Sequence, residues 1–396
     1  MQHYDYLIIG GGMASLSAAQ GIRRRDRQGN LAIFSSERYP VYNRPPLSKK
    51  LWTEDRVEDI WMRPDTRNLH VDEHLTTTVS TINARDKTVT DERGYTYGYT
   101  KLLLATGGTP KELPFRDVPI LYFRTLDDYF LLRRLTENKT QFLVIGGGFI
   151  GSEIAAALSM NHKEVRMIYP EPHLVDRFFP EDLKQVIDAK YLENDVKLVA
   201  NDTIETLKCE GDLIAATTQN GKKFRVEAVI AGIGIRPNQD LAQKAGLGVN
   251  DGITVNEYLQ TSDPDIYAAG DVASFSYPYP DQKSRMEHED NALAQGRAAG
   301  ENMAGANKVY THLPFFYSDM FSLGYEAIGN LDYRFDIFAN WKKVGEEGVL
   351  YYLHNQKVVG ILNWNVWDGI PKARQIIEKQ KTYQDPGELK GTIQNE

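Results

Sequence analysis

Cysteine is almost absent from this 396-residue sequence, which has a single one, Cys209. One thiol cannot form an intramolecular disulfide, a redox-active cysteine pair or a thiol-rich zinc site. His70 and His74 have the i,i+4 spacing of metal ligands, but their surroundings are polar and no third ligand is evident in the sequence. We therefore expect no bound metal, and any redox reaction would proceed without a cysteine partner.

Long hydrophobic runs and an excess of positive charge are also missing. The apolar segments stop far short of the ~18 residues that a membrane span needs, and the net charge is −8, from 46 basic and 54 acidic residues. We expect no membrane span and no nucleic-acid partner, because this charge does not attract polyanions over long range. No signal or transit segment is recognisable, so the simplest location is the cytoplasm, and a mitochondrial presequence outside the sequence is left open.

An internal repeat is the strongest signal in the sequence. Residues 6–19, YLIIGGGMASLSAA, match residues 142–155, FLVIGGGFIGSEIA, position for position. Each copy is an apolar run, a glycine triplet and an Ala-rich segment with helical periodicity, which is the order of a dinucleotide-binding unit. Glycine allows a tight turn and lets a pyrophosphate approach the backbone, while the helix start favours the phosphate charge. The pattern positions are Gly10, Gly12 and Ser15 in the first copy and Gly146, Gly148 and Gly151 in the second.

An acidic residue follows the next apolar run after each repeat, at Glu37 and at Glu171. Such an acid bonds a ribose hydroxyl in dinucleotide-binding units. The sequence therefore predicts two bound dinucleotides, against the alternative of two glycine-rich turns in an α/β protein that binds nothing. Glu171 favours NADH over NADPH, although the nearby Arg177 leaves the preference open.

The rest of the chain shows further strand and helix patterns. We expect a buried strand ending in a glycine turn at residues 102–110, a strand ending at Asp271 over residues 261–271, and a helix over residues 287–303. From about residue 311 the pattern changes to aromatic-rich alternating strands and a charged helix, which indicates a separate α+β domain. The expected fold class is α/β, with two or three domains in 396 residues.

The order of these motifs resembles the FAD- and NAD-dependent flavoprotein reductases with two dinucleotide-binding domains. Within that class, VYNRPPLSKKLW, MEHEDNALAQGRAAGENMAG, FFYSDMFSLGYEAIG and VVGILNWNVWDGIPKARQII are most similar to the apoptosis-inducing factor family, with oxygenase-coupled ferredoxin reductases next. The resemblance implies a glutathione reductase-like fold of two Rossmann-like domains plus a C-terminal α+β domain. It also implies a discontinuous FAD-binding domain at 1–118 and 238–310, an NAD-binding domain at 119–237 and a C-terminal domain at 311–396.

The resemblance places a lysine and a glutamate beside the hydride-transfer site of the flavin. Here they are Lys49 and Glu153, which would form a partly buried ion pair. Without the family, Lys49 reads as a solvated loop charge and Glu153 as a first-turn acid that relieves the helix dipole. Phe149 is either a gate for the nicotinamide or a core aromatic between helix and sheet. His288 is the third candidate catalytic residue, as a proton donor, although a lone histidine is more often structural.

The remaining candidates are cofactor contacts carried over from the family motifs. Asp271 would accept hydrogen bonds from the flavin ribityl chain, or cap a helix, and the helix that starts near Asp290 would direct its positive end at the flavin. Tyr317 stands where the family carries an aromatic residue over the ring system. Besides Lys49, Phe149, His288, Asp271 and Tyr317, the cofactor-binding set is Gly10, Gly12, Met13, Ala14, Glu37, Arg44, Val79, Ala105, Thr106, Gly107, Arg124, Gly147, Gly148, Ile150, Glu171, Arg177, Gly234, Glu287, Glu289, Glu326 and Asn365.

The resemblance implies hydride transfer from NADH to FAD. The segment VYNRPPLSK has no cysteine and Cys209 lies in the expected NAD-binding domain, so electrons would leave directly to a quinone, a small electron-transfer protein or oxygen. The alternative is an NADH-gated redox-sensing protein that dimerises or recruits a partner when reduced. The acidic charge, the short connection after LW and the missing insertion in KKVGEEGVLYY depart from animal members of the family, which weakens the transfer of DNA binding to this chain.

Overall fold

The computed structural model describes residues 1–54, 56–278 and 281–393. The chain forms two compact units, and each of them is built from three stretches of the sequence. The first unit is Met1–Arg44, Arg56–Thr109 and Arg236–Pro314, and the second is Pro45–Asp55, Pro110–Ile235 and Phe315–Glu396. The four domain segments expected from the sequence remain a prediction.

A seven-stranded sheet organises the first unit, in the order β3-β2-β1-β6-β5-β4, with β18 also paired to β6. The strands β1, β2, β3, β6 and β18 run parallel, whereas β4 and β5 are antiparallel. The carboxyl ends of parallel strands share one edge of a sheet, so the loops after β1 and β6 meet there. The bounds are β1 (Gln2–Ile9), β2 (Leu31–Phe34), β3 (Asp72–His74), β4 (Val79–Asn83), β5 (Thr88–Asp91), β6 (Thr96–Leu104) and β18 (Ile266–Ala268).

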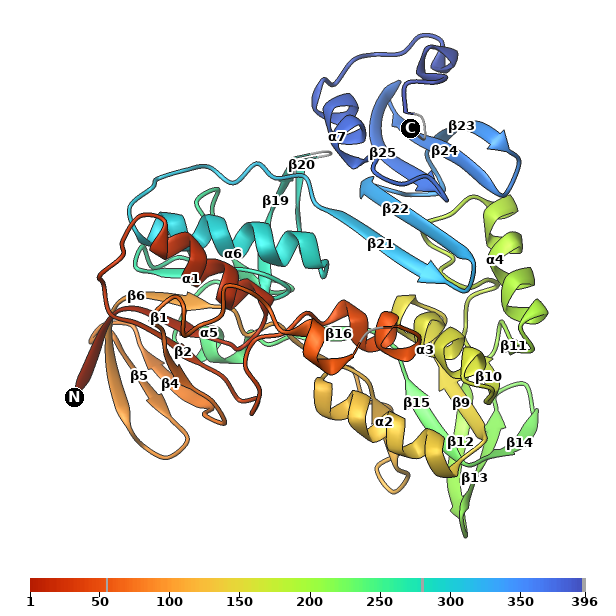
Figure 1. Cartoon of the computed structure of the whole chain (residues 1–396), viewed down its shortest axis with the longest axis horizontal. Helices are drawn as coiled ribbons and strands as arrows, with labels where there is room; N and C mark the ends of the chain where they lie inside the picture. The colour runs from red at the N-terminus through yellow and green to blue at the C-terminus, as the bar shows by residue number, and fades with distance from the viewer. Residues whose placement is uncertain (55, 279–280, 394–396) are drawn as a thin grey trace. The chain divides into compact units, whose positions relative to one another are not determined.

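Two helices of the first unit, α1 (Met13–Arg23) and α6 (Glu289–Met303), lie side by side (Figure 1). A Cβ at Gly296 would lie 2.2 Å from the carbonyl oxygen of Ala14, so this approach requires glycine. The helix predicted over residues 287–303 is confirmed, with its start at Glu289. The unit also contains η3 (Val57–Ile60), α5 (Asp240–Lys244) and the sheet β17 (Ile253–Thr254), β19 (Ala273–Pro278) and β20 (Asp281–Ser284).

The second unit contains a five-stranded parallel sheet in the order β11-β10-β9-β15-β8, with helices α2, α3 and α4. Its strands carry the second glycine repeat, because β9 ends at Ile145 and α3 begins at Phe149. The bounds are β8 (Ile120–Tyr122), α2 (Leu126–Asn138), β9 (Gln141–Ile145), α3 (Phe149–Met160), β10 (Glu164–Ile168), α4 (Glu181–Glu193), β11 (Lys197–Val199) and β15 (Ala228–Ala231), followed by the small sheet β12 (Ile204–Glu210), β13 (Leu213–Thr218) and β14 (Lys223–Val226). Its short elements are η1 (Pro45–Ser48) and η2 (Lys50–Trp52), whereas β7 (Gly108–Pro110) and β16 (Ile235–Pro237) lie where the chain passes from one unit to the other.

An antiparallel sheet, in the order β21-β22-β25-β24-β23, forms the C-terminal part of the second unit. The expected alternation of buried and exposed residues is wrong for β24 and β25, which are buried almost continuously. Both strands lie inside the sheet, and on one side of it the Tyr352 hydroxyl reaches back to the Phe178 carbonyl, 2.8 Å away. The bounds are β21 (Phe315–Met320), β22 (Leu323–Gly329), β23 (Asp336–Lys343), β24 (Glu347–His354), β25 (Lys357–Trp364), α7 (Ile370–Glu378) and η4 (Pro386–Leu389).

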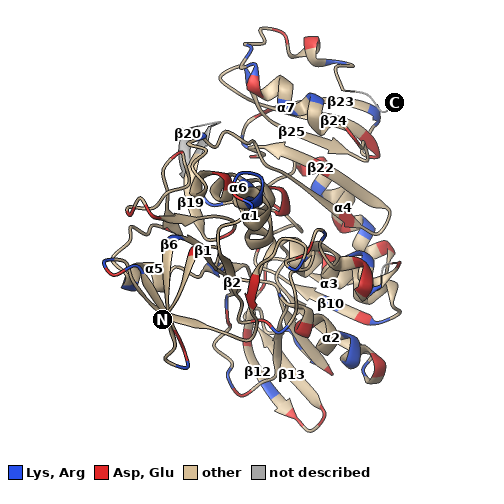
Figure 2. Cartoon of the chain, turned by 60° about the vertical axis from the view of Figure 1, so that its left-hand side comes forward, with Lys and Arg blue, Asp and Glu red and all other residues tan. Residues whose placement is uncertain are grey.

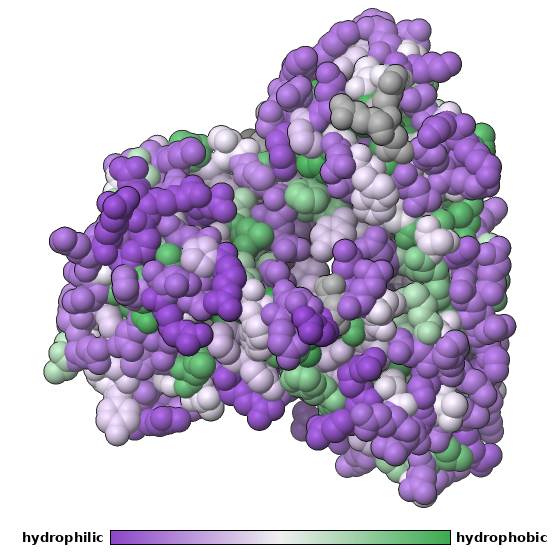
Figure 3. Space-filling view, viewed as in Figure 1, coloured by the Kyte–Doolittle hydropathy of each residue, from purple (hydrophilic) through white to green (hydrophobic). Residues whose placement is uncertain are grey.

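Charged and hydrophobic residues are dispersed over the surface. Acidic and basic residues are interspersed along the helices and loops in Figure 2, and hydrophilic residues cover most of the face shown in Figure 3. Within the described ranges, no helix combines the length and apolar character that crossing a bilayer requires. The same ranges contain no group of three or more His, Cys, Asp or Glu side chains arranged to hold a metal ion.

Candidate functional site

The first glycine turn joins β1 to α1 and uses its glycines for different reasons. Gly10 has φ +127°, and a Cβ there would lie 2.1 Å from the Ala105 carbonyl oxygen, so both conformation and packing require glycine. Gly12 has an ordinary extended conformation, with φ −94°, and a Cβ there would meet nothing within 4 Å. Nothing in the fold requires glycine at position 12, and the open space over its backbone is what a pyrophosphate needs.

The second glycine turn joins β9 to α3 with the same geometry. Gly146 has φ +110°, and its Cβ would lie 2.4 Å from the Gly232 carbonyl oxygen, whereas Gly148 is extended and opens onto free space. Gly151 is needed for packing, because its Cβ would lie 2.1 Å from the Gly146 carbonyl oxygen. The residues of both turns therefore fit a dinucleotide phosphate at the start of the helix.

The two ribose-binding candidates have different surroundings. The Glu37 carboxylate accepts a hydrogen bond from the Tyr42 hydroxyl, 2.6 Å away, and forms an ion pair with Arg44. Burial opposes the charge on Arg44, but Tyr42, Glu37 and Asp271 outweigh burial and raise the pKa of its guanidinium. Glu171 follows β10, and its side chain makes no hydrogen bond or ion pair within the described ranges.

Asp271 and the start of α6 are joined through a residue that the sequence reading missed. Asp271 precedes β19, so its alternative reading as a helix cap is wrong; the N-cap of α6 is His288. Arg285, whose side chain is 10% exposed, donates to the Asp271 carbonyl oxygen at 3.1 Å and to Glu287 Oε1 at 2.5 Å. In the sequence, Arg285 is marked only by its position two residues before the acidic Glu287.

Lys49 and Glu153 do form an ion pair, with Nζ 3.2 Å from Oε1. Their side chains are 9% and 5% exposed, so Lys49 is not a solvated loop charge. Glu153 is the fifth residue of α3, which excludes its reading as a first-turn acid. Its Oε2 accepts from the Ser48 hydroxyl at 2.6 Å and its Oε1 from the Ser318 hydroxyl at 2.7 Å. The two serines were missed from the sequence, although Ser48 immediately precedes Lys49.

Two aromatic candidates, Phe149 and Tyr317, also belong to the second unit. Phe149 is half-buried and stacks on Phe178 at 5.0 Å between ring centres, with Phe316 at 5.5 Å, so it belongs to an aromatic cluster at the start of α3. The Tyr317 ring faces the Lys49 ammonium at 4.1 Å, and its carbonyl oxygen accepts from the same Nζ at 3.0 Å.

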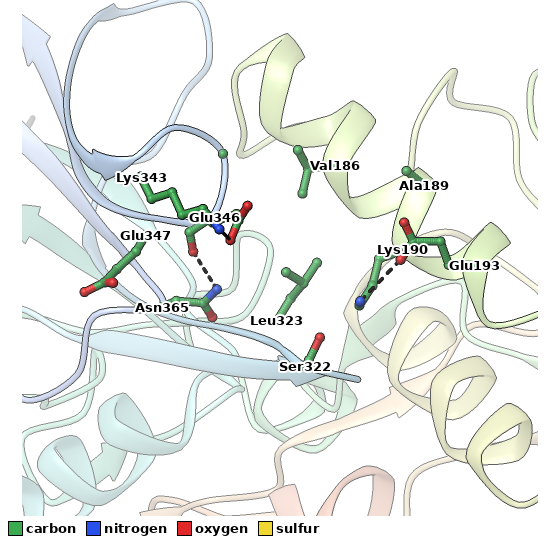
Figure 4. A pocket seen from close by; sticks show the side chains of 11 residues that line it. Val186, Ala189, Lys190, Glu193, Ser322, Leu323, Lys343, Glu346, Glu347 and Asn365 are labelled. Carbon is green, nitrogen blue, oxygen red and sulfur yellow. Dashed lines mark hydrogen bonds and ion pairs between the residues drawn. The ribbon is translucent and has the colours of Figure 1, made fainter.

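Glu326 and Asn365 lie further along the C-terminal sheet. Glu326 pairs with Tyr317 on one neighbouring strand and with Asn363 on the other, and burial raises the pKa of its carboxyl group. The Asn365 amide is used structurally, since it accepts from Gly324 N and donates to the Glu346 carbonyl, both at 2.7 Å. Asn365 also lines a cavity of about 560 Å³ between α4 and two turns of the C-terminal sheet (Figure 4), and no other predicted site residue lines it.

The other predicted contacts follow strand ends or helix starts. Thr106 and Asn238 exchange two hydrogen bonds of 2.8 Å, which fix the loop after β6. The structure therefore gathers Glu37, Arg44 and Asp271 in the first unit, and Lys49, Glu153 and Tyr317 in the second. The remaining residues lie as follows: Met13 and Ala14 begin α1, Val79 begins β4, Ala105 and Gly107 flank Thr106, Arg124 precedes α2, Gly147 and Ile150 flank the second turn, Arg177 is exposed in the loop before α4, Gly234 precedes β16, and Glu289 begins α6.

Comparisons with known proteins cover nearly the whole chain. Residues 4–296 match the family described as pyridine nucleotide-disulphide oxidoreductase, and residues 299–347 and 339–379 match the C-terminal family of mitochondrion-associated apoptosis-inducing factor. The chain is 31% identical to apoptosis-inducing factor 1, mitochondrial, of Dictyostelium discoideum, over 99% of this chain and 82% of the relative. It is 30% identical to monodehydroascorbate reductase 3 of Arabidopsis thaliana, over 90% and 88%.

A solved structure is similar over the same span. The reductase in the covalent putidaredoxin reductase–putidaredoxin complex matches with a TM-score of 0.89 and 28% identity, over 96% of this chain and 94% of the other.

Proposed function

Because this chain belongs to the pyridine nucleotide-disulphide oxidoreductase family, as an apoptosis-inducing-factor-like member, we propose that it carries electrons from NADH through FAD to an acceptor outside the protein. It is an FAD-dependent NAD(P)H oxidoreductase. Its acceptor, its preference for NADH and the roles of its site residues are proposals.

The buried ion pair of Lys49 and Glu153 is the observation that carries this proposal. Removing two charges from water costs several kcal/mol per ion, and such a pair is weak evidence for stability. A role in the chemistry better explains why two buried charges are kept on the helix that follows a dinucleotide turn and on the segment that pairs with it. In the proposed reaction, Lys49 holds a positive charge for the reacting ring and Glu153 fixes its position.

The two glycine turns support a proposed place for each nucleotide. In the first unit, Gly12 and the start of α1 would hold the FAD pyrophosphate, and the positive end of α6 would favour the reduced cofactor. In the second unit, Gly148 and the start of α3 would hold NADH, with Glu171 on its ribose. FAD, when bound, supplies the ring that accepts a hydride and releases electrons one or two at a time.

The proposed acceptor is a small electron-transfer protein. The segment around Lys49 has no cysteine and Cys209 lies exposed in β12, so no thiol pair is available as an intermediate carrier. The similarity to a reductase solved in covalent complex with putidaredoxin supports a protein acceptor over a quinone or oxygen. The compartment also stays a proposal: the sequence suggests the cytoplasm, whereas the Dictyostelium relative is named as mitochondrial.

The test is anaerobic stopped-flow reduction of the flavin with NADH. In separate experiments, the reduced protein is then mixed with a ferredoxin-type iron–sulphur protein, with a quinone and with oxygen, and the rate of flavin reoxidation is measured. We expect flavin bleaching by NADH and fastest reoxidation by the iron–sulphur protein. Fast reoxidation by a quinone or oxygen instead would replace the proposed acceptor. A reduced complex that resists every acceptor and elutes as a dimer would contradict the oxidoreductase proposal and favour the NADH-gated binding protein.

A further inference from the structure

The Glu153 carboxylate is held by two hydroxyl groups as well as by Lys49. Ser48 and Ser318 are 5% and 1% exposed, and each donates to a different oxygen of Glu153. These donors come from η1 and β21, 105 and 165 positions away in the sequence from Glu153 on α3. The hydroxyl of a buried serine more often forms a hydrogen bond with the backbone nearby in the sequence. Two serine hydroxyls that both donate to one carboxylate far away in the sequence therefore indicate a specific binding arrangement for that carboxylate.

The charge of Glu153 acts on one cation and two phenols among the residues that the structure describes, and Asp319 and Asp188 act on the same phenols. Lys49 is the cation, and the two titratable neighbours are Tyr191 of α4 and Tyr325 of β22. Burial, reinforced by the charge of Glu153, raises the pKa of both phenols, so both are neutral at physiological pH. The Lys49 ammonium is placed by three contacts: Glu153, the Tyr317 carbonyl oxygen and the Tyr317 ring.

We propose that Ser48 and Ser318 are positioning residues that keep Glu153 ionised and thereby fix the Lys49 ammonium. Burial disfavours the charged form of a carboxyl group, while hydrogen bonds donated to the charged form favour it. With a single contact of 3.2 Å from Lys49, the carboxylate would be free to rotate, whereas a hydroxyl on each oxygen holds it in place. The inference rests on the proposed function, in which the Lys49 charge acts on the flavin.

The variants Ser48→Ala and Ser318→Ala remove one hydroxyl each with little change in volume. Ser159→Ala is the matched control, because Ser159 lies on the same helix as Glu153 and donates to the Asn194 carbonyl at 2.8 Å. Ser318→Thr keeps the hydroxyl and suits a strand, so it should preserve the behaviour of the natural protein. Each FAD-loaded protein is titrated with dithionite and redox dyes between pH 5.5 and 9, which gives the flavin midpoint potential without NADH.

In both alanine variants, we expect Glu153 to take up a proton as the pH falls. The uncompensated Lys49 charge then favours the reduced flavin about tenfold, a rise of about 30 mV for two electrons, while the potential at pH 9 is unchanged. We expect no such rise of the potential at low pH in the natural protein, in Ser159→Ala or in Ser318→Thr. The proposal would be overturned if the flavin midpoint potentials of both alanine variants equal those of the natural protein at every pH.

Glu153→Gln provides a second measurement that leaves both serines in place. If the serines keep Glu153 ionised, the potential of Glu153→Gln is displaced from that of the natural protein by the same amount at pH 5.5 and pH 9. A displacement that vanishes at pH 5.5 contradicts the proposal even if an alanine variant fails to fold. Failure of the proposed function is a separate result, because it appears as absent bleaching by NADH and does not affect these chemically measured potentials.

Discussion

The two glycine turns share a glycine triplet and a similar backbone but differ in how exposed the residues after the triplet are. In the first unit, the residues after Gly12 are Met13 and Ala14, which are 6% and 7% exposed. In the second unit, Gly148 is exposed, Phe149 is half-buried and Ile150 is 40% exposed. A cofactor that stays bound needs a closed site, whereas a substrate that enters and leaves needs an open one. The difference agrees with FAD at the first turn and NADH at the second.

The same difference extends to equivalent positions in the two helices. Glu153 of α3 aligns with Ser17 of α1 in the repeat, and the Ser17 hydroxyl donates to the Leu293 carbonyl oxygen at 2.6 Å. The first helix therefore uses this position to pack against α6, and the second uses it for a buried charge. This contrast agrees with the proposal that the first turn holds a cofactor and that Glu153 of the second unit takes part in the chemistry.

The largest expected effect comes from filling the open space over each turn. Gly12→Val should abolish FAD binding, and Gly148→Val should keep FAD but raise the KM for NADH about 100-fold or more, because a side chain would occupy the place of the pyrophosphate. Flavin absorbance of the purified proteins and stopped-flow reduction measure the two effects. Loss of FAD in Gly148→Val, or normal FAD in Gly12→Val, would reverse the assignment of the turns.

A smaller effect is expected from exchanging the function of the aligned helix positions. Glu153→Ala should slow flavin reduction by NADH about tenfold to 100-fold, since the Lys49 ammonium loses the carboxylate that holds its position. Ser17→Ala should leave the reduction rate unchanged and lower stability by about 1 kcal/mol, through one lost hydrogen bond. Single-turnover reduction and thermal unfolding separate the two outcomes, and unchanged reduction kinetics in Glu153→Ala would remove Glu153 from the mechanism.

The two ribose-binding acids should differ in the same sense. Glu171→Gln is expected to reduce the preference for NADH over NADPH about tenfold, because a negative charge no longer repels the 2′-phosphate. Glu37→Gln should leave this preference unchanged and lower FAD retention, since Glu37 also holds Tyr42 and Arg44. The ratio of kcat/KM for the two nucleotides tests both variants. An unchanged ratio in Glu171→Gln would assign the preference to another residue.

The parts of the molecule that a local pattern encodes could be read from the sequence. Both glycine turns, their strands and helices, and α6 follow from the spacing of glycine and apolar residues. The pairing of Lys49 with Glu153 could be predicted only from the family resemblance. The two residues lie 104 positions apart in the sequence, and no local pattern encodes a contact over that distance. Ser48, Ser318 and Arg285 were missed for the same reason, since serine and arginine are common and only the tertiary fold shows what they contact.

The smallest expected effect contrasts two acids that each precede a strand, Asp265 before β18 in the first unit and Glu227 before β15 in the second. Asp265 pairs with Lys101 and Lys87 in the first unit, and hydrogen bonds and charge from these lysines lower its pKa. Glu227 in the second unit accepts from the backbone N–H groups of Thr140 and Gln141, at 2.6 and 2.8 Å, which lower its pKa.

Because both pKa values are lowered by folding, the stabilisation is present above the unfolded-state pKa values of about 4 and is lost as the pH falls through the lower folded-state values. At pH 7, Asp265→Asn and Glu227→Gln should each lower the Tm by about 2 to 4 °C, for about 1 kcal/mol. Added salt at 0.5 M should remove most of the difference for Asp265→Asn, because screening weakens exposed ion pairs. It should remove little of the difference for Glu227→Gln, because backbone N–H groups lower the pKa of Glu227 more than the charge of Lys139 does. Calorimetric scans at low and high salt measure this contrast, and an equal response of the two variants to salt would show that both units hold these strands by the same interaction.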